Sequence, residues 1–121
     1  MAGFDGSFLH VLVVEDSAII AMDLEQALAD IGIARVSLAP GAAEGFAIAA
    51  GGDVDAALVG ILPGDETGGA LVHRLRTDAK PVVLMADFGD EGALRALFPG
   101  VPLLFKPFTR ADLARMMAQL C

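Results

Sequence analysis

Short runs rich in apolar residues alternate along the chain with longer segments of helical periodicity. Such runs predict buried strands, because a strand that is covered on both faces is apolar throughout. The expected strands lie at residues 10–14, 35–38, 56–59, 81–85 and 103–105. The expected helices lie at residues 17–31, 40–50, 68–76, 90–97 and 109–120. This alternation predicts an α/β fold, with a parallel sheet covered by helices on both faces.

Local signals predict where several of these helices begin and end. The first helix carries one apolar stripe, formed by Ile20, Leu24, Ala27, Leu28 and Ile31. Gly32 is the expected stop of that helix, and Pro40 is expected in the first turn of the next one. Thr109 is expected to cap the last helix, with Asp112 three residues later as an imperfect capping box.

Composition and charge narrow the class of protein. The 121 residues are 55% hydrophobic, which is enough for one globular domain spanning residues 1–121. The formal net charge of -8 argues against a nucleic-acid-binding surface, because binding to phosphates requires basic clusters. Residues 1–73 hold eleven acids and one base, whereas residues 74–121 hold five acids and seven bases. Any surface that meets an acidic partner therefore belongs to the second half.

The sequence gives little indication of secretion, membrane insertion or metal binding. Cys121 is the only cysteine and the last residue, so no intrachain disulfide is expected and the reducing cytoplasm is the expected location. The sequence shows neither a signal-peptide pattern nor an apolar run of membrane-spanning length. His10 and His73 have no partners at metal-ligand spacing, so we expect structural or surface histidines.

The most informative residues lie directly after the strands. Because the carboxyl ends of parallel strands meet at one edge of the sheet, residues that follow different strands share one crevice. The residues predicted to converge there are Glu15, Asp16, Gly60, Ala86 and Lys106. A site built from two acids and a lysine would normally carry its reactive group on the central strand. Glycine has no side chain that could react.

Four segments resemble the receiver domain of two-component response regulators. They are VLVVEDSAIIAMDLEQAL, DAALVGILPGDE, PVVLMADFGDEGALRAL and LLFKPFTRADLARMM, and the match covers nearly all of residues 9–120. The resemblance implies a flavodoxin-like, doubly wound parallel sheet with strand order 2-1-3-4-5. It also implies bacterial phosphorelay signalling, in which an aspartate accepts a phosphoryl group from a histidine kinase. In that chemistry Mg²⁺ and a lysine neutralise the crowded negative charge.

The resemblance identifies Glu15 and Asp16 with the acid pair that holds Mg²⁺, and Lys106–Pro107 with the lysine–proline pair of the family. Without a central aspartate the metal loses a ligand, so we expect Mg²⁺ binding to be weak or vestigial. The alternative is that both acids simply lie at a helix N-terminus, where the helix dipole stabilises them. For Lys106 we expect a salt bridge to Asp16 that holds the crevice closed.

Three positions that act as the switch in the family are altered here. The phosphoacceptor position falls on Gly60, five residues after Asp55, and a shift by one residue would place the equally unreactive Val59 there. The Thr/Ser position falls on Ala86, and the aromatic position falls on Leu103. We therefore predict that aspartyl phosphorylation is lost. Two explanations of Gly60 stay open. The residue reflects either evolutionary drift in a domain that no longer needs phosphorylation or selection for an open space that a partner's side chain can enter.

Other polar residues lie near the predicted crevice. Asp87 is placed either to contact Lys106 at the rim or to point into solvent. Asp65 and Glu66 are expected to be solvated acids of a turn. Thr67 has little support as an alternative phosphoacceptor, because a hydroxyl lacks the ionised nucleophile of an aspartate.

These observations predict an atypical receiver domain that is not an enzyme and acts as a protein-interaction module. The expected partner is a histidine kinase or an effector, with a homodimer as a further option. The expected interface lies around the last helix and consists of Arg95, Phe108, Arg110 and Arg115. The alternative is that these arginines only form ordinary surface ion pairs and bind no partner. Two other functions stay open, namely phosphoryl transfer to Asp16 or Asp87 and the sensing of a small anion in the emptied crevice.

Overall fold

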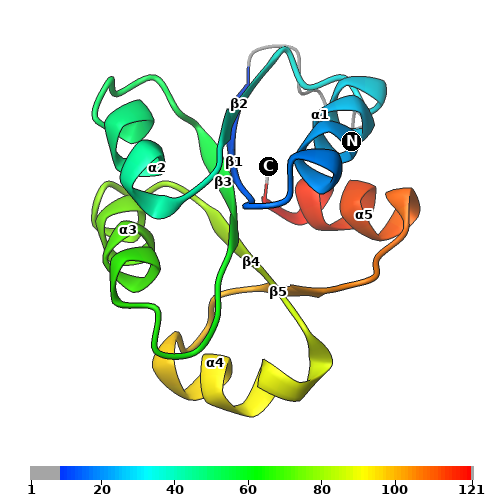
Figure 1. Ribbon diagram of the computed structural model, residues 1–121. Helices are drawn as coiled ribbons and strands as arrows, with labels where there is room; N and C mark the ends of the chain where they lie inside the picture. The colour runs from blue at the N-terminus through cyan, green and yellow to red at the C-terminus, as the bar shows by residue number, and fades with distance from the viewer. Residues whose placement is uncertain (1–8, 121) are drawn as a thin grey trace.

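The computed structural model describes residues 9–120, which contain a five-stranded parallel sheet (Figure 1). The strands are β1 (His10–Val14), β2 (Arg35–Ala39), β3 (Ala56–Gly60), β4 (Val82–Ala86) and β5 (Leu103–Phe105). Their order is β2-β1-β3-β4-β5, so the predicted flavodoxin-like topology is confirmed. The chain reverses its direction of winding at β1, and such a reversal opens a crevice at the carboxyl ends of the strands.

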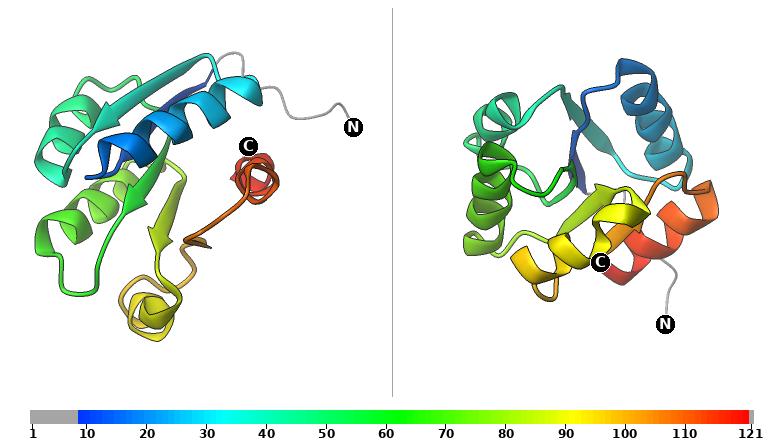
Figure 2. Two further views of the ribbon diagram at one scale, coloured as in Figure 1. Left: turned by 45° about the vertical axis from the view of Figure 1, so that its right-hand side comes forward. Right: turned by 60° about the horizontal axis from the view of Figure 1, so that its bottom comes forward.

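The helices form two layers, one on each face of the sheet. They are α1 (Ala18–Asp30), α2 (Ala42–Ala49), α3 (Glu66–Thr77), α4 (Glu91–Leu97) and α5 (Arg110–Leu120), and the 3₁₀ helix η1 (Phe88–Asp90) leads into α4. In both Figure 1 and the right-hand view of Figure 2, α1 and α5 lie on one side of the sheet and α2 and α3 on the other. Helix α4 contributes Leu94 to the core that α3 also covers.

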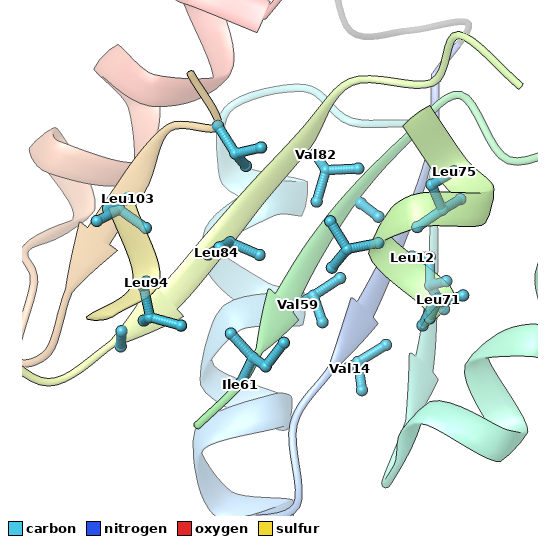
Figure 3. Packing of buried hydrophobic residues seen from close by; sticks show 14 of the residues in the cluster. Leu12, Val14, Val59, Ile61, Leu71, Leu75, Val82, Leu84, Leu94 and Leu103 are labelled. Atoms are coloured by element: carbon cyan, nitrogen blue, oxygen red, sulfur yellow. The ribbon is translucent and has the colours of Figure 1, made fainter. Parts of the chain in front are cut away.

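Alternate residues of each strand face opposite layers, as the geometry of a strand requires. In β1, Val11 and Val13 pack in the core that contains α1 and α5, whereas Leu12 and Val14 pack toward α2 and α3. Figure 3 shows this second core, in which Leu71 of α3 lies close to the β1 side chains. Since these four β1 residues are at most 4% exposed, the apolar run of the sequence is buried on both faces.

Several helix ends follow the local signals in the sequence. Ser17 caps α1 by accepting a hydrogen bond from the backbone N–H of Ile20, and Gly32 follows the helix with a φ of 99°. At the start of α5, the side chains of Thr109 and Asp112 each accept a hydrogen bond of 3.0 Å from the other's backbone N–H. The capping box is therefore complete, although aspartate replaces the more usual glutamate.

Two expectations about the helices are wrong in detail. Pro40 does not open α2, because Gly41 is an extended N-cap residue and the helix begins only at Ala42. Ile20 does not belong to the buried stripe of α1, since it is 39% exposed while Ala21 is 6% exposed. Ile20 lies in the first turn of α1.

Both histidines lie among the described residues, and His10 is held by contacts with neighbouring polar groups. The His10 ring is buried and lies 2.6 Å from the Ser37 hydroxyl through Nε2 and 3.2 Å from the Asp53 carbonyl oxygen through Nδ1. These contacts satisfy both ring nitrogens, as expected for a structural histidine. His73 is exposed on α3. Cys121 lies outside the described residues.

Candidate functional site

A cavity of about 340 Å³ opens at the carboxyl edge of the sheet, over the ends of β1, β3, β4 and β5. All the residues that were predicted to converge line it, namely Glu15, Asp16, Gly60, Ala86 and Lys106. Asp87 lines it as well. The strand ends therefore bring these residues together in space, and what the crevice can do depends on how its charged groups are paired.

Lys106 spans the crevice to Glu15. Its Nζ atom lies 2.6 Å from Glu15 Oε1, while Glu15 Oε2 accepts a hydrogen bond of 3.0 Å from the backbone N–H of Ser17. The two charged residues follow β5 and β1, which are separated in the sheet by β3 and β4. The Glu15 side chain is 3% exposed and that of Lys106 is 29% exposed. The carboxylate is thus buried, paired and fully hydrogen-bonded, as a buried charge must be.

The expectation that Lys106 pairs with Asp16 is wrong. Both acids follow β1, which ends at Val14, and the lysine meets the first of them. Glu15 is buried against it, and Asp16 stays exposed at the mouth of the crevice.

The electrostatic balance keeps Glu15 ionised. Burial raises the pKa of the Glu15 carboxyl, because a low-dielectric environment disfavours the charged form. Hydrogen bonds from Lys106 and from the Ser17 backbone outweigh burial, so the pKa of Glu15 lies below its ordinary value of 4.5. At neutral pH the crevice therefore contains a closed ion pair, in which the lysine charge is already neutralised.

The middle of the crevice is formed by residues without reactive side chains. Gly60 ends β3, and a Cβ atom there would lie 3.1 Å from the Val14 carbonyl oxygen and 3.6 Å from Glu15 Oε1. A side chain at this position would therefore project toward the ion pair and require a small shift of the β1 backbone. Val59 is 0% exposed and packs in the core, so it does not reach the crevice. Ala86 ends β4 and offers no hydroxyl.

The donor set does not fit a tight Mg²⁺ site. Mg²⁺ needs near-octahedral oxygen ligation from one or more carboxylates. Both Glu15 oxygens are already engaged by Lys106 and Ser17, which leaves Asp16 as the nearest free acid. Within residues 9–120, no three His, Cys, Asp or Glu side chains are grouped so that they could share a metal ion. As the described side chains are placed, the crevice therefore offers Mg²⁺ no ready group of ligands.

The remaining acids surround the crevice rather than fill it. Asp65 caps α3, since its Oδ1 accepts a hydrogen bond of 2.8 Å from a backbone N–H of that helix. Asp87 is exposed, and the ion pair that Lys106 makes within the described residues is with Glu15. Glu66 and Thr67 lie exposed in the first turn of α3 and are not part of the crevice lining.

Several solved structures share this architecture along nearly the whole chain. SdrG from Sphingomonas melonis Fr1 is 27% identical, with 94% of this chain and 97% of that chain covered and a TM-score of 0.74. A response regulator receiver protein from Sinorhizobium medicae WSM419 is 25% identical, with 93% of both chains covered and a TM-score of 0.78. The signal receiver domain of an HD domain-containing protein from Pseudomonas fluorescens Pf-5 is 18% identical, with 98% of this chain and 90% of that chain covered and a TM-score of 0.80.

The chain has the fold of response-regulator receiver domains. The strand order and the nearly complete overlap with solved receiver domains decide this. No protein-family model and no curated protein matches the sequence, so the likeness is carried by the structure and by the motifs at the strand ends. Leu103 holds the position at which the resemblance implied an aromatic residue, and it is 9% exposed.

An aromatic pair beside β5 is a feature that the sequence analysis missed. Phe88 of η1 stacks on Phe105 of β5, with ring centroids 4.6 Å apart and an angle of 16° between the rings. Phe88 is nevertheless 68% exposed. The pair lines a second cavity of about 310 Å³, to which Pro107 also contributes after a cis peptide bond. The available signal was a phenylalanine in an otherwise polar loop.

Two of the four predicted interface residues, Arg110 and Phe108, face α1. Arg110, in the first turn of α5, pairs with Asp30 and lies 3.7 Å from Asp23, both on α1. Phe108 is partly buried against the core between α1 and α5. These residues therefore fasten α5 to α1.

The other two interface residues are paired within their own helices. Arg95 lies 2.8 Å from Glu91 on α4, and Arg115 pairs with Asp112 on α5. Arg115 also lines the second cavity beside the aromatic pair. The four predicted residues thus do not form one continuous surface. None of the helices in the described part of the chain is long and apolar enough to span a membrane.

Proposed function

We propose that this chain is an atypical receiver domain of bacterial two-component signalling that is not phosphorylated on aspartate and acts as a protein-interaction module. The observation that carries the proposal is Gly60 at the end of β3, in the middle of the crevice. Aspartyl phosphorylation requires a carboxylate nucleophile at this position. The receiver-domain fold and the motifs at the strand ends support a role in signalling.

Phosphoryl transfer to a neighbouring acid is disfavoured by the same geometry. Glu15 is the acid closest to Lys106, but both of its oxygens are already bonded. Asp16 and Asp87 are exposed at the mouth of the crevice, where water and salt screen any stabilising charge. A phosphoryl group on either of them would lack a free lysine to neutralise it.

Sensing of a small anion in the crevice is disfavoured by the charges that line it. The positive charge of Lys106 is balanced by Glu15. The lining adds three further carboxylates, from Asp16, Asp65 and Asp87. An anion that entered the crevice would therefore meet a net negative potential.

The proposed partner surface centres on η1, β5 and α5. Phe88 supplies an exposed aromatic ring on this side, and Arg115 lies beside the same cavity. Aromatic and arginine side chains are the types that most often anchor protein interfaces. Arg95 of α4 extends the surface, whereas Arg110 and Phe108 hold α5 in place behind it. The expected partner is a histidine kinase, an effector or a second copy of this chain.

The phosphorylation part of the proposal can be tested with beryllofluoride, which mimics a phosphoryl group on a carboxylate. Amide ¹H–¹⁵N spectra would be recorded with Mg²⁺ alone and then with Mg²⁺ and beryllofluoride. The proposal predicts no further shifts on addition of beryllofluoride. A new set of shifted amides around Gly60 would overturn it.

The interaction part needs a separate test, because a domain can lack phosphorylation and still bind nothing. Candidate kinases and effectors from the same genome would be captured with the wild-type domain and with an Arg95→Ala/Arg115→Ala variant. The proposal predicts that at least one specific partner is lost with the variant. Unchanged capture of every partner would overturn the assignment of this surface.

A further inference from the structure

Two basic side chains near the amino edge of the sheet have no acidic partner among the described residues. All eight lysine and arginine residues of the chain fall within residues 9–120. Six of them form ion pairs with carboxylates there, namely Arg35, Arg74, Arg95, Lys106, Arg110 and Arg115. Arg76 and Lys80 form none within these residues. Because acids outnumber bases by sixteen to eight in this chain, two unpaired cations are unexpected.

Arg76 and Lys80 line the same cavity. It has a volume of about 300 Å³ and lies where β4 and β5 begin, at the opposite edge of the sheet from the crevice. The rest of its described lining is apolar residues and glycine, namely Ala79, Pro81, Val82, Gly100, Val101, Pro102 and Leu120. No carboxylate is among these lining residues, whereas four carboxylates line the crevice. The two cavities therefore differ in the sign of their charge.

The turn that carries the two cations is held by its own backbone. The N–H of Ala79 donates a hydrogen bond of 3.0 Å to the Arg76 carbonyl oxygen, and the N–H of Lys80 donates one of 2.8 Å to that of Leu75. These bonds form a Schellman motif at the end of α3, in which glycine usually takes the left-handed position. Here Ala79 takes it, with a φ of 59°. A strained residue thus lies between the two cations, and such strain is concentrated at functional sites.

The helix end by itself explains only part of this arrangement. Carbonyl groups at the C-terminus of a helix favour positive charge nearby. Arg74 also lies in the last turn of α3, but it pairs with Asp78 at 2.9 Å and does not line the cavity. Asp78, the nearest acid in the sequence, is therefore engaged by Arg74. The positive charges of Arg76 and Lys80 are left available to a ligand in the cavity.

The lining indicates which class of ligand fits. A phosphate monoester carries about two negative charges at neutral pH. An arginine binds phosphate oxygens through two parallel hydrogen bonds, and a lysine adds a second positive charge. The apolar lining suits an apolar body attached to the phosphate. A volume of about 300 Å³ is at the small end of ligand sites, so it has room for one ring and not for a dinucleotide.

We propose that this cavity binds a small phosphate monoester with an apolar body, and that Arg76 and Lys80 hold its phosphate. The domain would then bind a phosphate group without a covalent bond, at the edge of the sheet opposite the crevice. The cavity shares no lining residue with the crevice. Binding there does not depend on whether the domain is phosphorylated or which protein it contacts, so this proposal and the proposed function can fail separately.

Phenyl phosphate is the probe, because it joins a phosphate monoester to a single ring. Amide ¹H–¹⁵N spectra follow its titration at about pH 7.5, where the phosphate is almost fully ionised. We expect a dissociation constant on the order of 1 mM, with shifted amides at residues 76–80 and 100–101 and weaker binding at raised salt. Inorganic phosphate lacks the ring and benzyl alcohol lacks the charge, so each should bind at least about tenfold more weakly.

Variants of the two cations then locate the binding site. Arg76→Gln and Lys80→Gln should each weaken binding of phenyl phosphate by about tenfold, because each removes one of the two charges that hold the phosphate. Arg95→Gln is the matched control, since it changes the net charge equally but lies on α4, outside the cavity lining. That variant should bind like the wild type. The spectrum of each variant without ligand shows whether it is folded.

Three results would overturn the proposal. The first is the absence of shifts at residues 76–80 and 100–101 with phenyl phosphate up to about 10 mM. The second is equal binding of inorganic phosphate, which would mean that the apolar lining contributes nothing. The third is an equal loss of binding in Arg95→Gln and Arg76→Gln, which would mean that the ligand responds to net charge and is not held in the cavity.

Discussion

The outer and inner strands of the crevice differ in what they carry at their carboxyl ends. β1 and β5 lead into Glu15 and Lys106, which meet at 2.6 Å. β3 and β4, which lie between them, end in Gly60 and Ala86. The outer strands thus supply charge, and the inner strands supply space. A crevice of this kind can hold its own edges together, and neither inner strand ends in a side chain that could accept a phosphoryl group.

The small inner residues and the outer ion pair are physically linked. A Cβ atom at Gly60 would lie 3.6 Å from Glu15 Oε1, so any larger side chain there would approach the carboxylate that Lys106 binds. An acid at this position would compete with Glu15 for the lysine. With glycine, Lys106 has a single buried partner. The glycine that leaves β3 without a carboxylate at its end therefore also leaves the ion pair undisturbed.

The largest expected effect comes from restoring an acid to the inner strands. Gly60→Asp should convert a domain that is not labelled by acetyl phosphate and Mg²⁺ into one that gains a phosphoryl group, because a carboxylate then lies beside Glu15, Asp16 and Lys106. Labelling should be slow, since Ala86 offers no hydroxyl. Intact-mass spectrometry over time measures the adduct.

Gly60→Asn is the matched control for this experiment, because its amide has nearly the same shape and cannot form an acyl phosphate. We expect no adduct on this variant. If a folded Gly60→Asp variant stays unlabelled, the absence of a carboxylate at position 60 is not sufficient to explain a lack of phosphorylation.

Breaking the outer pair should have the next largest effect. Lys106→Ala leaves the Glu15 carboxylate buried without its partner, and should lower the free energy of unfolding by about 2 kcal/mol, less than for a fully buried pair because Lys106 is partly exposed. Chemical denaturation measures the change. Lys80→Ala, a half-buried lysine outside the crevice, is the control and should change little.

A double variant sharpens the same test. Glu15→Gln/Lys106→Ala removes both charges, so it should be more stable than Lys106→Ala alone. If the double variant were less stable than Lys106→Ala by the full cost of Glu15→Gln measured alone, the two residues would be acting independently.

Acid should weaken the outer pair through Glu15. The folded-state pKa of this carboxyl is lowered, so the unfolded chain takes up the proton first as pH falls. The stability that Glu15 contributes is therefore fully present above its unfolded pKa of about 4.5 and is lost as pH drops through the lower folded value. The difference in unfolding free energy between wild type and Glu15→Gln should shrink between about pH 6 and about pH 3. If the difference in unfolding free energy stayed constant over this pH range, Glu15 would not be the ionised partner of Lys106.

The smallest effect is expected far from the crevice. Arg95 and Glu91 form a pair one turn apart on α4, with side chains 56% and 43% exposed. Arg95→Ala should change the free energy of unfolding by less than about 0.5 kcal/mol, because exposed pairs are screened by water. If Arg95→Ala lowered the free energy of unfolding as much as Lys106→Ala, burial would not be what makes the Lys106–Glu15 pair the stronger of the two.

Most of the fold could be predicted from the sequence, because it depends on patterns that are local. The expected strands 10–14 and 103–105 match β1 and β5 residue for residue, since short apolar runs there end at charged residues. The convergence of strand ends followed from parallel pairing alone. It correctly placed Gly60 and Ala86 between the two charged residues.

The parts that could not be predicted depend on side-chain direction. Lys106 pairs with whichever of the two adjacent acids, Glu15 or Asp16, faces inward. The sequence alone does not distinguish between them. The stacking of Phe88 on Phe105 depends on the course of the loop between β4 and α4. The exposure of Leu62 depends likewise on the geometry of a loop. These residues lie in loops or at strand ends, where local patterns are weakest.

The central claim is that the crevice lacks a phosphoacceptor, and intact mass after incubation with acetyl phosphate, Mg²⁺ and a phosphorylated kinase tests it most directly. A receiver domain that is known to be labelled would be included, together with the Gly60→Asp variant. We predict no mass increase for the wild-type chain while both comparators gain a phosphoryl group. A stoichiometric adduct on the wild type would contradict the claim, and peptide mapping would then identify which carboxylate serves in place of the one absent at Gly60.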